Sequence, residues 1–169
     1  MDDLIGQLVR SLKEKNIYDS INIIITTDHG MASTSQDSMI FLDDYIDLNN
    51  IEVVDWGPAC AILPKVNVDS IFSKLADAHP MLDVYKKGEL PDELHYIDHN
   101  SIQPIIAIAK EHWSISSRTS FENNPERFNG GNHGYYSTYE SMRGIFFARG
   151  PAFKKGFNCL LYTSPSPRD

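Results

Sequence analysis

Apolar residues follow two different spacings along this chain. Between residues 4 and 12 they recur every three or four positions, which is the spacing of one face of a helix. A short turn then leads into a run of Ile and Thr at residues 21–27, and this run predicts a buried strand because β-branched side chains fit a pleated sheet. Further extended segments are predicted at residues 51–56, 59–63, 82–85, 102–109, 112–117 and 144–148.

Small and polar residues separate these segments. Residues 32–38 and 118–132 predict loops because Ser, Thr, Asn and Gly dominate them. Asn67 precedes a second apolar stripe at helical spacing, so we expect it to cap a helix there. Helical and extended segments alternate along the chain, and this pattern is typical of an α/β fold.

The first predicted strand ends in a carboxylate, an imidazole and a glycine. Asp28 and His29 offer an oxygen and a nitrogen ligand that suit zinc or a similar divalent ion. In open α/β sheets, ligands bind beside the carboxyl ends of the strands, which is where these two side chains fall. The simpler interpretation is a turn in which Asp28 caps the next segment and Gly30 allows a tight exit from the strand.

A second histidine lies among glycines. His133 stands between Gly131-Asn132 and Gly134, shortly before the last predicted strand. A single histidine in a loop is usually just solvated. Two histidines, each beside a sheet edge, favour a shared ligand-binding role.

The neighbours of His133 have open roles. Tyr135 and Tyr136 either stack on a base or simply cover the sheet edge. Asn132 is expected to orient the site through a hydrogen bond to the metal-bound oxyanion or to a neighbouring loop.

The remaining histidines and one cysteine have simpler interpretations. His79, His95, His99 and His112 are expected to be ordinary polar or packing residues. Cys60 lies in an apolar run and is expected to be a buried small hydrophobic residue rather than a reactive thiol.

Composition and charge narrow the class of partner. The chain has 169 residues, of which 41% are hydrophobic and 22% charged, as in an ordinary globular domain. A formal net charge of −8 gives no general basic surface for nucleic acid or acidic lipid. No apolar run approaches the about 20 residues that span a bilayer, and the acidic start has no signal-peptide pattern.

On these residues the chain resembles the nucleotide pyrophosphatase/phosphodiesterase family, a branch of the alkaline phosphatase superfamily. Residues 27–31 (TDHGM) and 131–135 (GNHGY) look like two metal-binding signatures of that family. The resemblance covers roughly residues 2–156. Shorter matching segments fall in the expected order at residues 57–59, 94–96, 102–105 and 150–154.

The resemblance implies an alkaline-phosphatase-like fold with a mainly parallel sheet flanked by helices. It also implies hydrolysis of phosphodiester or pyrophosphate bonds with two zinc ions and a threonine nucleophile. Asp28 and His29 are then expected to bind the zinc that activates the threonine, and His133 to bind the other zinc. The implied substrate is a nucleotide or a phospholipid head group.

The resemblance further implies that this chain holds only part of the site. The family's nucleophile, its neighbouring aspartate and a further Asp and His precede the segment that corresponds to the first helix, so no catalytic residue is expected here. Thr26 and Thr27 belong to the strand and are not the nucleophile. We therefore expect residues 1–157 to be the C-terminal part of a catalytic domain and to be inactive alone.

The end of the chain and the location of the protein are separate expectations. Residues 158–169 lack an apolar period and depart from the family pattern, so they are expected to be a disordered tail of non-native linker sequence, the alternative being a native disordered end. The family is mainly extracellular, either secreted or anchored through segments that are not in this chain.

Two other interpretations remain open. Phosphoglycerate mutases and phosphoethanolamine transferases of the same superfamily share an Asp-His-Gly element, although residues 131–135 and 150–153 favour the phosphodiesterases. A non-catalytic binding protein that keeps the fold is opposed by the intact set Asp28, His29 and His133.

Overall fold

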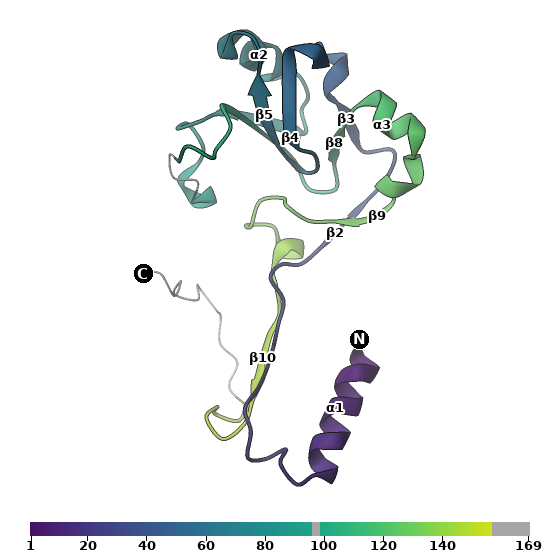
Figure 1. Ribbon diagram of the computed structural model, residues 1–169, viewed down its shortest axis with the longest axis vertical. Coiled ribbons are helices and arrows are strands. Elements are labelled where there is room, and N and C mark those ends of the chain that lie inside the picture. The colour runs from purple at the N-terminus through teal and green to yellow at the C-terminus, as the bar shows by residue number, and fades with distance from the viewer. Residues whose placement is uncertain (96–98, 157–169) are drawn as a thin grey trace. The chain divides into compact units, whose positions relative to one another are not determined.

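A computed structural model describes residues 1–95 and 99–156 of the chain. The described chain divides into two compact units. The end unit joins residues 1–27 to the segment that starts at Ile145, and the central unit spans Asp28–Gly144. Most of the labelled strands in Figure 1 belong to the central unit.

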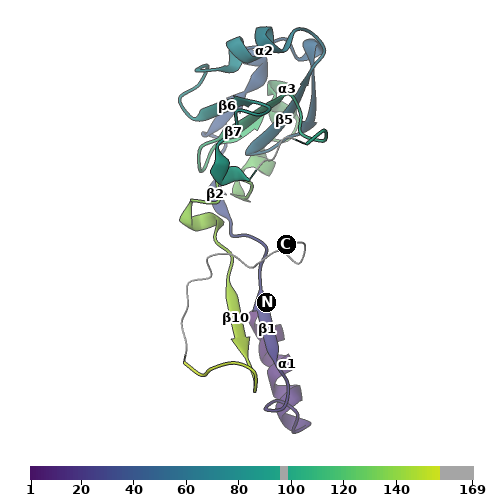
Figure 2. The same cartoon turned by 90° about the vertical axis from the view of Figure 1, so that its left-hand side faces the viewer.

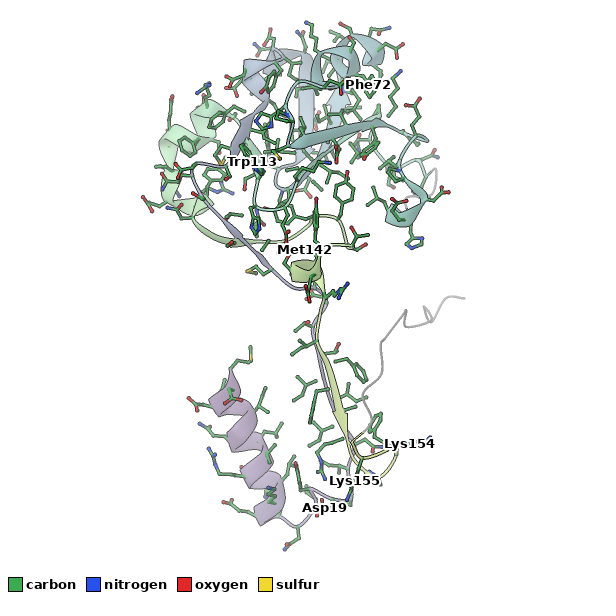
Figure 3. All side chains as sticks on the ribbon, turned by 180° about the vertical axis from the view of Figure 1, so that it is seen from behind. Asp19, Phe72, Trp113, Met142, Lys154 and Lys155 are labelled. Carbon is green, nitrogen blue, oxygen red and sulfur yellow. The ribbon has the colours of Figure 1, made fainter. Side chains whose placement is uncertain are left out.

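The end unit pairs two strands from distant parts of the sequence. Helix α1 (Asp2–Glu14) leads to β1 (Ile23–Thr26), which pairs antiparallel with β10 (Phe146–Arg149) (Figure 2). The guanidinium of Arg149 ties this pair to the preceding turn through a 2.9 Å bond to Asp19, which Figure 3 labels. None of the described side chains in the end unit is buried.

The central unit is built on a four-stranded antiparallel sheet. Strands β4 (Ile51–Asp55) and β5 (Ala59–Pro64) form a hairpin, helix α2 (Val68–Leu75) follows, and β6 (Leu82–Lys86) and β7 (Ile105–Ala109) complete the sheet. The strand order is β4-β5-β7-β6, and β7 runs antiparallel to both of its neighbours. Strands β5 and β6 are therefore parallel to each other, with β7 inserted between them.

The hydrophobic core lies around β7, whose five residues are all buried. Ile71 and Leu75 of α2 pack against this sheet, and Phe72 and Trp113, labelled in Figure 3, border the core. The side chain of Asn67 accepts a 3.1 Å bond from the backbone N–H of Ser70, so the predicted helix cap is confirmed.

Two short ladders complete the central unit. Strand β2 (Ala32–Thr34) pairs antiparallel with β9 (Gly130–Asn132), and β3 (Met39–Phe41) pairs parallel with β8 (Ser114–Ser116). Helix α3 (Arg118–Asn123) follows β8. Single 3₁₀ turns occupy Leu42–Asp44, Leu48–Asn50, Asp92–Leu94, Pro125–Phe128 and Glu140–Met142.

The α/β character is as predicted, but the described sheets are mostly antiparallel rather than mainly parallel. The alternation of strand, helix and strand in β5-α2-β6 is present and gives a parallel relation. The later strand β7 lies between β5 and β6 and is antiparallel to both. Every pair of neighbouring strands in this sheet is therefore antiparallel.

Two predicted loops contain regular structure. Residues 32–38 include β2, and residues 118–132 include α3 and β9. Their Ser, Thr, Asn and Gly content is typical of loops, and the ladder between the two segments joins residues about a hundred positions apart, which no local pattern indicates. The strand predicted at residues 21–27 is present as β1, but its side chains alternate between half-buried and exposed rather than buried.

The tail predicted at residues 158–169 lies outside the described residues, so its disorder and its origin stay predictions, as does the domain boundary at residue 157. In the part of the chain that the structure describes, no helix is long and apolar enough to cross a membrane.

Candidate metal site

The β2–β9 ladder brings together two tripeptides of the same kind. Asp28-His29-Gly30 precedes β2, and Asn132-His133-Gly134 begins at the last residue of β9. The two strands run antiparallel with Ala32 opposite Asn132, so the segment before β2 and the segment after β9 lie at the same end of the ladder. Two histidines about a hundred residues apart in sequence thereby become neighbours.

The two imidazole rings stack face to face. The ring centroids of His29 and His133 are 3.8 Å apart, and their planes are inclined by only 18°. The proximity expected from the sequence is therefore present in the structure. The role of these residues as metal ligands stays a prediction.

His29 is oriented by a bond to the main chain. Its Nδ1 lies 2.7 Å from the carbonyl oxygen of Gly30. A carbonyl oxygen only accepts, so Nδ1 donates, and the neutral ring keeps its lone pair on Nε2. A histidine that binds a metal typically has its other nitrogen bonded in this way, which fixes the tautomer and the ring orientation.

Asp28 and His29 place two potential metal ligands next to each other. Its Oδ2 lies 3.6 Å from Nε2 of His29, and its side chain is 86% exposed. Its other oxygen, Oδ1, accepts a 3.0 Å bond from the backbone N–H of His29. A free carboxylate oxygen and a free imidazole nitrogen are therefore neighbours, and both are good ligands for zinc.

Asn132 repeats the local geometry of Asp28. Its Oδ1 accepts a 2.9 Å bond from the backbone N–H of His133, as Asp28 does for His29. This bond is to the residue next in sequence, so the expectation that Asn132 bonds a metal-bound oxyanion or a neighbouring loop stays a prediction. Among the described residues, no three His, Cys, Asp or Glu side chains converge on one point.

Gly30 is required by a close approach of two backbones. A Cβ at this position would lie 2.0 Å from the carbonyl oxygen of Ser141 and 2.7 Å from that of Arg143. The N–H of Gly30 donates a 2.9 Å bond to the carbonyl of Met142. From the sequence, Gly30 is interpreted as allowing a tight exit from a strand. In the structure, its backbone packs closely against the backbone of residues 141–143.

Tyr135 and Tyr136 are both engaged within the fold. Tyr135 is buried, and its hydroxyl donates a 3.0 Å bond to the carbonyl of Trp113. Burial raises the pKa of Tyr135 to about 12. Tyr136 donates a 2.7 Å bond to Oδ2 of Asp83. Both hydroxyls thus have partners inside the central unit, while stacking of either ring on a base stays a prediction.

The partners of Tyr136 form a polar network that the sequence analysis did not single out. Oδ2 of Asp83 also accepts a 2.6 Å bond from Nζ of Lys110, and the hydroxyl of Tyr85 lies 2.9 Å from that of Tyr136. Burial, the hydroxyl of Tyr85 and the carboxylate of Asp83 all raise the pKa of Tyr136. The bond to Asp83 raises the pKa of Lys110. In the sequence, the one local indication of this network is Tyr136 itself, the second tyrosine after His133-Gly134.

The other histidines serve local structure, as predicted. The Nδ1 atoms of His79 and His99 accept backbone N–H bonds two residues ahead, at 3.1 Å and 3.2 Å. His112 bonds the carbonyl of Ser33 at 2.8 Å. His95 ends a 3₁₀ turn with φ of 53°.

Asn132 also lines a recess with both polar and apolar walls. This pocket has a volume of about 240 Å³, and its walls include Ser116, Ser120, Arg127 and Trp56. Hydroxyls, an amide and a guanidinium around one recess suit a small polar group. The sequence analysis gave no signal for it, because its walls come from four separate segments.

Comparison with known proteins identifies the family of this chain. Residues 1–136 match the family described as type I phosphodiesterase / nucleotide pyrophosphatase. Because that match covers well over half of the sequence, the chain belongs to this family.

Individual relatives are similar over most of the chain. A bis(5'-adenosyl)-triphosphatase of Mus musculus is 43% identical over 157 residues, which are 93% of this chain and 33% of the relative. Ectonucleotide pyrophosphatase/phosphodiesterase family member 5 of Homo sapiens is 42% identical over 159 residues, which are 94% of this chain and 32% of the relative. The chain therefore spans about a third of the length of these relatives.

Solved structures show the same similarity in three dimensions. Human ectonucleotide pyrophosphatase / phosphodiesterase 5 superposes with a TM-score of 0.84 at 41% identity, covering 92% of this chain and 41% of that one. The murine form, in a variant described as inactive that replaces one threonine by alanine and is in complex with AMP, superposes with a TM-score of 0.82 over 91% of this chain and 40% of that one.

Proposed function

We propose that this chain is part of a zinc-dependent hydrolase that cleaves phosphodiester or pyrophosphate bonds. Asp28 and His29 supply ligands to one zinc ion, and His133 supplies a ligand to the second. The threonine nucleophile and the remaining ligands belong to parts of the enzyme that this chain does not contain. When bound, two such ions activate the attacking oxygen and stabilise charge on the transferred phosphoryl group.

The stacking of His29 on His133 is the observation that carries this proposal. Stacked rings hold two imidazole edges next to each other, and neighbouring ligands are what a pair of ions about 3.5–4 Å apart requires. The residues also fit zinc in kind, because Nε2 of His29 is the unbonded nitrogen and an Asp28 oxygen lies beside it. Three ligands shared between two ions leave each ion short of the usual four.

The substrate we propose is a nucleotide rather than a lipid head group. Relatives at 38–43% identity are named bis(5'-adenosyl)-triphosphatases, and one similar structure is a complex with AMP. Several relatives carry the name of ectonucleotide enzymes, and on that basis we propose that the complete protein acts outside the cell.

The metal assignment is tested by zinc binding to this chain. Asp28→Asn, His29→Gln and His133→Gln are each expected to lower the zinc affinity measured against a chromophoric chelator. His112→Gln is the matched control, because it removes an exposed imidazole of the same unit whose contacts are Ser33 and the carboxylate of Glu111 rather than His29 or His133. Equal zinc affinity in His29→Gln and in the unsubstituted chain would contradict the assignment.

The reaction is tested in a chimaera in which this chain replaces the matching segment of human ectonucleotide pyrophosphatase / phosphodiesterase 5. We expect the isolated chain to release no nitrophenol from a nitrophenyl nucleotide ester and the chimaera to release it. His29→Ala and Asp28→Ala in the chimaera are expected to abolish turnover with little loss of fold. A chimaera that binds zinc but has no turnover would instead support a non-catalytic protein that keeps the fold.

A further inference from the structure

We propose that Tyr136, held by Asp83, Lys110 and Tyr85, is the positioning residue that sets the orientation of His133. The inference rests on the proposed function for its relevance to zinc, although the geometry that it describes is independent of any metal. Nothing in the two metal signatures indicates this role, since Asp83, Tyr85 and Lys110 lie far from both in sequence.

The segment that carries His133 is held at both ends. On its amino side, Asn132 belongs to β9 and pairs with Ala32. On its carboxyl side, Tyr135 is buried and bonded to the carbonyl of Trp113. Only His133 and Gly134 lie between these two fixed points.

Gly134 makes the carboxyl anchor important. Its φ of 98° lies in the region that favours glycine, and a Cβ there would meet no atom within 4 Å. A glycine in open space constrains the chain least of all residues. One anchor at Tyr135 leaves the peptide free to rotate about that residue, whereas a second anchor at Tyr136 removes this freedom.

The network that holds Tyr136 has one consistent direction of hydrogen bonding. A carboxylate only accepts, so Tyr136 gives its proton to Asp83, and the hydroxyl of Tyr85 must then donate to the oxygen of Tyr136. Lys110 donates to the same oxygen of Asp83 and balances its charge. Each member therefore has a partner, and such a satisfied network is rigid.

The strands that supply this network are part of the sheet. Asp83 and Tyr85 are two residues apart on β6 and so project from the same face, and Lys110 directly follows β7. The network therefore connects the His133 segment to the most buried strand of the central unit through its neighbour β6.

The first test uses the chain without metal. The stacked rings of His29 and His133 are expected to give a nuclear Overhauser effect between their ring protons, measured in histidine-labelled chain. Tyr136→Phe is expected to abolish this effect while the circular dichroism of the sheet is retained. Tyr139→Phe is the matched control, because Tyr139 packs its ring edge-on against Tyr136 and its hydroxyl has no hydrogen-bond partner among the described residues. A ring-to-ring effect that persists unchanged in Tyr136→Phe overturns the proposal.

The second test adds zinc alone as the probe. Removing groups that orient a metal ligand typically lowers metal affinity about 10-fold or more, so Tyr136→Phe is expected to raise the zinc Kd by about 10-fold and Tyr139→Phe to leave it unchanged. His133→Gln gives the affinity without that ligand. If His133→Gln does not change zinc affinity, the metal assignment fails, and the ring-to-ring effect still decides the positioning role.

A milder substitution covers loss of folding. If Tyr136→Phe unfolds the chain, Tyr85→Phe takes its place, because it removes only the bond from Tyr85 and keeps the one to Asp83. It is expected to weaken the ring-to-ring effect and the zinc affinity in the same direction. An unchanged effect in that variant counts against the proposal.

Discussion

Cys60 shows how burial alone decides the chemistry of a side chain. It lies on β5 with none of its surface exposed. Burial, with a smaller contribution from the carboxylate of Asp55, raises the pKa of its thiol from 9.0 to about 12. A thiol that keeps its proton is a poor nucleophile, so Cys60 acts as the small apolar residue that its sequence context predicts.

The raised pKa of Cys60 predicts that stability falls in alkaline solution. The folded chain keeps this proton up to about pH 12, whereas the unfolded chain releases it near pH 9.0. As the pH rises through this window, the free energy of unfolding should therefore fall, by about 1.4 kcal/mol per pH unit for one proton. Urea unfolding at several pH values measures the slope.

The control for this prediction is Cys60→Ala. It should remove that part of the slope and leave the part that arises from Tyr135, whose pKa is raised to about 12, and from Tyr136, whose pKa is raised as well. The protein with Cys60 and the Cys60→Ala variant both carry Cys159→Ser, so that they differ in one thiol only. Identical slopes in the two proteins would contradict the prediction.

At the scale of single residues, the sequence indicates the candidate ligands of the site but not the residues that hold them in place. Asp28, His29 and His133 stand out because a carboxylate and an imidazole follow a predicted strand directly and a second imidazole lies among glycines. The partners of Tyr136 could not be predicted, because Asp83 and Lys110 are ordinary surface residues until the sheet places them side by side. Their role depends on pairing between strands, which a local pattern does not contain.

Among the elements, the β2–β9 ladder has the largest effect on the site. It is only three residues long, yet it fixes the distance between the two histidine segments. Gly30 adds a second attachment, because its N–H bonds the carbonyl of Met142.

Gly30→Ala should therefore disrupt the histidine segment. The added methyl group would meet backbone oxygens that cannot move independently, so we expect a loss of more than about 2 kcal/mol in unfolding free energy. Gly131→Ala is the matched control, since its methyl group would meet Sδ and Cγ of the flexible, exposed Met31 side chain rather than backbone. Urea denaturation of both variants measures the difference, and an equal effect would show that the contact at Gly30 is soft.

The cap of α2 makes a second prediction at this scale. Asn67→Ala removes the side-chain oxygen that accepts from Ser70 and should lower the unfolding free energy by about 1 kcal/mol. Asn67→Asp keeps a capping oxygen and should preserve most of the stability. A loss as large in Asn67→Asp as in Asn67→Ala would point to another role for this side chain.

Elements were predicted more accurately than their connections. The segments at 51–56, 59–63 and 82–85 correspond to β4, β5 and β6, and each strand places at least one apolar residue in the core: Ile51, Cys60, Ile62 and Leu82. The direction of pairing was not predictable, since the insertion of β7 between β5 and β6 depends on a segment about twenty residues further along. Local periodicity gives the type of an element and leaves its neighbours open.

For the whole molecule, the described core lies entirely in the central unit. Its buried cluster extends from Ala32 to Met142, whereas none of the described side chains of the end unit is buried. An isolated two-stranded ladder is marginally stable in water. The stability of this chain therefore belongs to residues 28–144.

Hydrogen exchange should separate the two units. Backbone amides of β7 are expected to exchange at the slow rate of global unfolding, and those of β1 and β10 to exchange within the first time points, because local opening needs no loss of core. Mass spectrometry of peptides from each strand gives the comparison. Slow exchange in β1 would show that the end unit is stabilised by contacts that its exposure does not indicate.

The place of β7 in the sheet also has a consequence for biosynthesis. During translation the hairpin β4–β5 and then β6 leave the ribosome while the strand that belongs between β5 and β6 is still being made. Until residues 105–109 emerge, both neighbours present open edges, which are sites for wrong pairing and aggregation. A nascent chain stalled just before β7 should therefore be far more sensitive to protease than one stalled well after it. Slow codons ahead of this strand would prolong the time for which the two strand edges stay unpaired.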